Sequence, residues 1–139
     1  MRYLWCGETR TLGLASVAQY VPSVSESDIE RIVQRDYPAD LQAFIHEAIR
    51  GIEVREKPRV IMACLKNADG NFEKLKGELA NASGWWREII GQAEYPNYTK
   101  KMFRIDRLSA DEQERIIEKD KTQYLAWLHR RSPSEKSEP

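Results

Sequence analysis

The sequence has few of the residues from which metal sites and disulfide frameworks are built. It contains only two cysteines and two histidines among 139 residues. Cys6 and Cys64 are too far apart for a disulfide scaffold and form no Cys-x-x-Cys pair, and the histidines complete no ligand pattern with them. We therefore expect free thiols in a reducing cytosol, with no metal and no other cofactor.

An excess of charge of one sign and a long apolar run are also missing. Lys plus Arg number 22 and Asp plus Glu number 22, so the formal net charge is zero. Nucleic acids and acidic membranes attract basic surfaces, so neutrality disfavours both as partners. No apolar run approaches the roughly 20 residues that span a bilayer, and Glu8 and Arg10 interrupt the apolar N-terminal residues, against a signal peptide. The sequence predicts a cytoplasmic protein without membrane contact.

Signatures of catalysis are weak. The seven glycines are scattered singly, so no phosphate-binding loop is present. Cys64 lies in the apolar run Val60–Leu65, where burial would raise the thiol pKa and oppose formation of a thiolate. We assign no catalytic residue. A small hydrolase or transferase that uses Cys64 with His46 remains an alternative hypothesis.

The sequence does contain clear signals for helices and for where they begin. Ser27–Glu30 and Ser109–Glu112 both have the pattern of a capping box at the start of a helix. Pro38 suits the first turn of a helix, and after it apolar residues recur at i, i+3, i+4, i+7 and i+8. The members of this inward stripe are Leu41, Phe44, Ile45, Ala48 and Ile49. Val60–Leu65 is apolar nearly all round, which predicts the central helix, with a strand as the alternative because the run is short.

These signals predict an all-α fold, an irregular bundle of about six short helices. The last helix, from Ala110, is expected to be the longest, and Ser83-Gly84 is expected to end the helix that Asn71 caps. We divide the chain into an N-terminal arm (1–26), a helical domain (27–131) and a disordered tail (132–139). The tail is too polar to bury apolar surface.

Two motifs carry a resemblance to a known family. Gly70-Asn71 opens a helix, and the run Trp86–Ile90 (Trp-Arg-Glu-Ile-Ile) is followed by Ala93–Pro96 (Ala-Glu-Tyr-Pro). In these motifs the chain resembles a family of short bacterial proteins with no established activity, over about half its length. The resemblance implies a helical fold and a bacterial cytosol. The chain departs from the family pattern at Trp85, where a polar residue is more usual, and in the extension before Ser27.

The densest aromatic segment of the chain predicts a partner surface. Adjacent tryptophans on a helix point about 100° apart, so both are hard to bury in a small bundle, and aromatic residues beside arginine are typical interface anchors. The candidate partner-binding residues are Trp85, Trp86, Arg87, Glu94, Tyr95 and Tyr98. The competing interpretation places Trp86 in the core and packs Trp85 beneath the N-terminal arm.

A local basic cluster follows this segment. Lys100, Lys101, Arg104 and Arg107 lie close to two tyrosines, a combination found in proteins that bind single-stranded nucleic acid. The neutrality of the domain favours a solvated face instead.

The leading hypothesis is a small protein-binding or regulatory protein, one version being an immunity- or antitoxin-type inhibitor. A weak nucleic-acid binder is the second alternative, and a homo-oligomer stays open.

Overall fold

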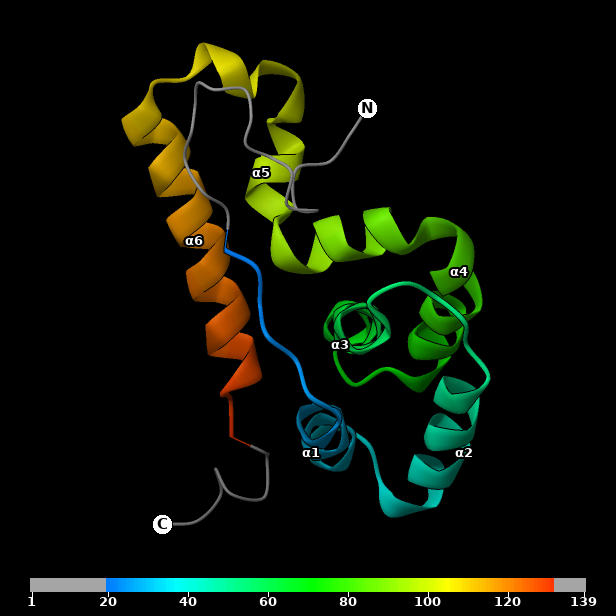
Figure 1. Cartoon of the computed structure of the whole chain (residues 1–139). Helices are drawn as coiled ribbons and strands as arrows, with labels where there is room; N and C mark the ends of the chain where they lie inside the picture. The colour runs from blue at the N-terminus through cyan, green and yellow to red at the C-terminus, as the bar shows by residue number, and fades with distance from the viewer. Residues whose placement is uncertain (1–19, 132–139) are drawn as a thin grey trace.

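The computed structural model describes residues 20–131 and shows only helices, turns and extended segments over that range (Figure 1). The predicted all-α fold is confirmed. Most of the predicted arm and the whole predicted tail lie outside the described residues. The elements are α1 (Glu26–Asp36), α2 (Ala39–Arg50), α3 (Lys57–Ala68), α4 (Phe72–Glu94), α5 (Pro96–Lys100), the 3-10 helix η3 (Met102–Arg107) and α6 (Ala110–Leu128).

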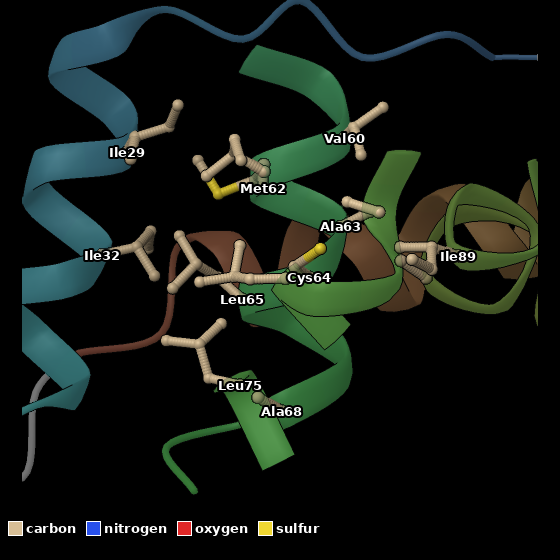
Figure 2. Packing of buried hydrophobic residues seen from close by; sticks show 14 of the residues in the cluster. Ile29, Ile32, Val60, Met62, Ala63, Cys64, Leu65, Ala68, Leu75 and Ile89 are labelled. Atoms are coloured by element: carbon tan, nitrogen blue, oxygen red, sulfur yellow. The ribbon is translucent and has the colours of Figure 1, made fainter. Parts of the chain in front are cut away.

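Helix α3 forms the centre of the molecule, as its apolar run predicts. Every residue of Val60–Leu65 is buried. Figure 1 shows α3 end-on, with α4 wrapped around it, α2 beside the first half of α4, and α6 along the left edge of the view, where the extended segment that leads into α1 runs between α6 and α3. Figure 2 shows side chains of α1, among them Ile29 and Ile32, facing α3, and Ile89 of α4 on the other side of α3. One continuous core results, because α3 buries all of its faces at once.

The last helix, α6, is the longest apart from α4. α4 has 23 residues and α6 has 19. The break predicted at Ser83-Gly84 lies one residue later: α4 consists of two helical stretches that meet in a kink at Trp85, whose backbone is non-helical, with φ −120° and ψ 28°. The Ser83 hydroxyl donates to the Glu53 carbonyl at 3.1 Å. α4 can therefore turn at the kink and follow the surface of α3.

The first capping box is displaced by two residues from its predicted place. Ser25, not Ser27, caps α1: its hydroxyl accepts from the Asp28 N–H at 3.2 Å, and its own N–H donates to the Asp28 carboxylate at 3.0 Å. Both serines have an acid three residues later, so the sequence pattern fits either position. The second capping box, between Ser109 and Glu112, is confirmed.

Helix α2 buries less than its apolar stripe predicts. Only Ile45 is fully buried, Leu41 and Ile49 are half-buried, and Ala48 is exposed. Phe44 is 66% exposed. α2 lies at the edge of the bundle and packs on one side only, so the outer part of a wide stripe has no partner among the described residues.

Candidate interaction surfaces

The structure divides the predicted aromatic segment between core and surface. Trp86 is 9% exposed and packs in the core, whereas its neighbour Trp85 is 58% exposed. Glu94 and Tyr95 are buried, and Tyr98 is half-buried. The kink at Trp85 adds to the ordinary 100° step between helical neighbours, so Trp85 turns outward as Trp86 turns inward.

Glu94 belongs to a buried polar network. The Arg59 guanidinium donates to the two Glu94 oxygens at 2.7, 2.9 and 3.2 Å and to the Tyr95 hydroxyl at 3.4 Å. The Tyr95 hydroxyl donates to the Tyr20 carbonyl at 2.6 Å. Burial raises the pKa of Glu94, and hydrogen bonds from Arg59 partly offset that rise. These residues join α3 to the end of α4, so Glu94 and Tyr95 cannot meet a partner without the domain opening.

Two charged residues of the segment stay at the surface. Arg87 is exposed and its guanidinium lies 4.7 Å from the centre of the Trp86 ring, so it covers the outer edge of that tryptophan. Glu88 is exposed as well. Of the predicted partner-binding set, Trp85 and Arg87 are thus exposed, Tyr98 is partly accessible, and Trp86, Glu94 and Tyr95 are interior.

The basic cluster proves to surround an aromatic side chain that the sequence interpretation missed. We call residues 100–107 the basic turn. Its four cations, Lys100, Lys101, Arg104 and Arg107, are all exposed. Phe103 lies among them and is 93% exposed, more than any other large apolar residue of the described chain. The sequence did hold a signal for this: the residues three and four positions away from Phe103 are Thr99, Lys100, Asp106 and Arg107, so no apolar stripe includes it.

Hydrogen bonds from α6 hold the basic turn in place. The buried carboxylate of Asp120 accepts from the N–H groups of Asn97 and Tyr98 at 2.9 and 3.0 Å and from the Asn97 side chain at 2.8 Å. The Gln113 side chain donates to the carbonyls of Ile105 and Leu108 at 3.0 and 3.1 Å. The backbone N–H groups at the start of α5 have no acceptor within the helix and favour a negative charge there. The turn is thus fixed at both ends.

The basic turn carries exposed cations with carboxylates close beside them. Within residues 20–131 no ion pair satisfies Lys100, Lys101, Arg104 or Arg107. Asp106 lies within the turn. The first turn and a half of α6 beside it presents exposed carboxylates at Asp111, Glu112 and Glu114. The basic patch is therefore small and has an acidic border.

The hypothetical Cys64–His46 pair does not form a reactive site. Cys64 is fully buried in α3, and burial raises the pKa of its thiol to about 12. His46 is half-buried on α2 and lines an open cleft of about 500 Å³ against α1 and the start of α3. Cys64 is not among the residues that line this cleft. A thiol that stays protonated and out of reach of solvent is a poor nucleophile.

A second hollow lies between α2 and the first half of α4, with a volume of about 420 Å³. We call it the α2/α4 groove. Its lining is apolar except for one lysine: Leu41, Phe44, Ile45 and Ala48 come from α2, and Phe72, Leu75, Lys76 and Leu79 come from α4. The outer part of the predicted α2 stripe therefore lines an open surface hollow instead of the core.

Among residues 20–131, no cluster of three or more His, Cys, Asp or Glu side chains is arranged to bind a metal ion. Within the same range, no helix has the length and apolar character needed to cross a membrane. Comparison of the chain with protein-family models, with curated proteins and with solved structures found no match.

Proposed function

We propose that this chain is a regulatory or adaptor protein that binds a partner protein through the basic turn, with Phe103 as the apolar anchor. The observation that carries the proposal is the 93% exposure of Phe103 between cations that lack ion pairs within the described chain. Aromatic and arginine side chains dominate contact energies when a partner desolvates them. A fitting partner offers an apolar pocket bordered by carboxylates.

The acidic border of the basic turn favours a protein over a nucleic acid. A nucleic-acid strand presents phosphate along its whole length, so strand continuing past the turn would meet Asp111 and Glu112. Proteins that bind single strands also offer several stacking aromatics along a basic groove, whereas Tyr95 is buried and Tyr98 half-buried. A protein partner can instead present charges of both signs, each opposite its complement.

The proposed setting is the bacterial cytosol that the family resemblance implies, and the proposed contact lies at residues 100–107 instead of residues 85–98. An immunity- or antitoxin-type protein that masks an enzyme is one version of this function.

Site-specific photo-crosslinking tests the proposal. A photoreactive phenylalanine analogue replaces Phe103 in the native host, and in a matched control it replaces Glu118, which is exposed on α6. We expect one product of discrete mass from position 103 and none from position 118. Arg104→Glu with Arg107→Glu should abolish that product while the helical circular dichroism stays unchanged.

A second measurement separates the alternative function. Fluorescence anisotropy with a labelled single-stranded oligo-dT should show no binding at physiological salt. Salt-dependent binding that Arg104→Glu removes would replace the proposal with the nucleic-acid alternative. If position 103 gives no discrete protein product, the proposed function fails.

A further inference from the structure

The α2/α4 groove lies on a different face from the basic turn and calls for a separate explanation. Figure 1 shows α2 alongside the first half of α4, away from η3 and α6. The groove is open and almost entirely apolar. Apolar hollows between two helices are a common docking place for another helix.

The same face carries a projection as well as a hollow. Phe44 lines the groove and is nevertheless 66% exposed, so its ring stands at the outer edge of α2. A twofold interface pairs one patch with a second copy of itself, so the patch must hold both the projecting group and the cavity that receives it. We propose that a second copy of this chain occupies the groove, with Phe44 of each copy inserted between α2 and α4 of the other.

The charges at the two edges of the groove agree with a second copy as the occupant. Asp40 and Glu47 lie four residues before and three residues after Phe44, so all three share one edge of α2. Lys76 marks the opposite edge, on α4. Under twofold symmetry the acidic edge of each copy meets the basic edge of the other.

The ion pairs that these charged residues form within one copy do not oppose new ion pairs between two copies. Lys76 lies 3.3 Å from Glu73 and 5.1 Å from the centre of the Phe72 ring, and Glu47 pairs with Arg50. Both ion pairs join exposed side chains in the same helix, so either can be given up at little cost. The equal numbers of acidic and basic residues also leave no net repulsion between two copies.

Sedimentation equilibrium of the purified full chain over a wide concentration range tests the inference. We expect the mass of two chains for the wild type and of one chain for Phe44→Asp. Phe103→Asp is the matched control, because it makes the same change at an exposed phenylalanine on another face, and it should leave the dimer intact. Both variants should keep the helical circular dichroism of the wild type, because neither phenylalanine is buried.

Charge reversal identifies the partner as a second copy. Glu47→Lys alone and Lys76→Glu alone should each weaken the dimer by about tenfold, and the two changes together should restore it. A wild type that stays monomeric overturns the inference, as does a dimer that survives Phe44→Asp or dissociates in Phe103→Asp. A groove filled by another protein would appear as a monomer that gives a discrete photo-crosslink from position 44, which also overturns it. Crosslinking at position 103 is unaffected by these outcomes, so the two proposals can fail separately.

Discussion

Trp85 and Trp86 are neighbours in the chain that occupy opposite environments. Trp86 packs in the core beneath the Arg87 guanidinium, while Trp85 stands at the kink of α4, exposed to solvent. Removing an aromatic side chain that buries a large apolar area lowers the free energy of unfolding strongly. Removing an exposed one changes that free energy very little.

We expect Trp86→Ala to lower the free energy of unfolding by ~3–5 kcal/mol. Trp85→Ala should change it by less than ~0.5 kcal/mol. Urea denaturation followed by circular dichroism measures both, and each variant is the control for the other. Equal losses would mean that Trp85 is covered in solution.

The Arg59–Glu94 pair is a deeply buried ionic contact, with side chains 7% and 2% exposed. Glu94→Ala should cost ~3–5 kcal/mol, because it leaves a guanidinium in the interior without its main acceptor. Glu88→Ala, an exposed acid on the same helix, is the control and should cost less than ~0.5 kcal/mol. Replacing Arg59 and Glu94 together by leucine should cost less than the sum of the single changes, since no lone charge remains. Additive losses in denaturation would contradict a direct pairing.

At the scale of the element, the start of α1 depends on a short polar exchange between Ser25 and Asp28. The backbone N–H of Ser25, with its hydroxyl and Arg31 also contributing, holds the pKa of the Asp28 carboxyl below its usual value of 3.8. A carboxyl whose folded pKa is depressed stabilises the fold above its unfolded pKa and loses that contribution as the pH falls through the folded pKa.

Asp28→Asn should therefore destabilise the protein by ~0.5–1 kcal/mol near neutral pH. The difference in the free energy of unfolding between variant and wild type should shrink as the pH falls below the ordinary carboxyl pKa. It should vanish once the pH has fallen through the pKa of Asp28 in the folded state. Denaturation at a series of pH values measures this difference. Glu30→Gln changes the acid of the capping box that the sequence predicted, and it should have almost no effect. A larger loss from Glu30→Gln would restore Ser27 as the cap.

At the scale of the whole molecule, α6 adds Tyr124 and Trp127 to the buried core and is also held by polar contacts at separated points. The Arg35 guanidinium donates to the carbonyls of Trp127, Leu128 and Arg130 at 2.8 to 3.1 Å, which caps the end of the helix. Farther back in the helix, Asp120 accepts from the start of α5. α6 adds only Tyr124 and Trp127 to this core cluster, whereas the whole run Val60–Leu65 of α3 belongs to it, so we expect α6 to open before α3.

We expect Asp120→Ala to cost about 2–3 kcal/mol, because it leaves two backbone N–H groups without their charged acceptor. Hydrogen exchange should accelerate across α6 and the basic turn, while the amides of α3 keep their protection. Lys119→Ala, at the exposed neighbouring position, should leave exchange unchanged. Uniform acceleration throughout the chain would show that α6 unfolds only with the core.

By itself the sequence determined the helical class, the central place of Val60–Leu65, the capping of α6 by Ser109, and the burial of Cys64. These features follow from local rules, since period, capping residues and continuous apolar runs act within a few turns of chain. Tertiary structure decided which apolar residues found a partner. Phe44 belongs to the same apolar stripe as Ile45 but is exposed, because it lies at the edge of the bundle. The sequence around Glu94 indicates a surface acid, and only the fold brings Arg59, 35 residues away, into contact with it. Burial depends on what packs across a face, and the spacing of residues along one helix carries no information about that.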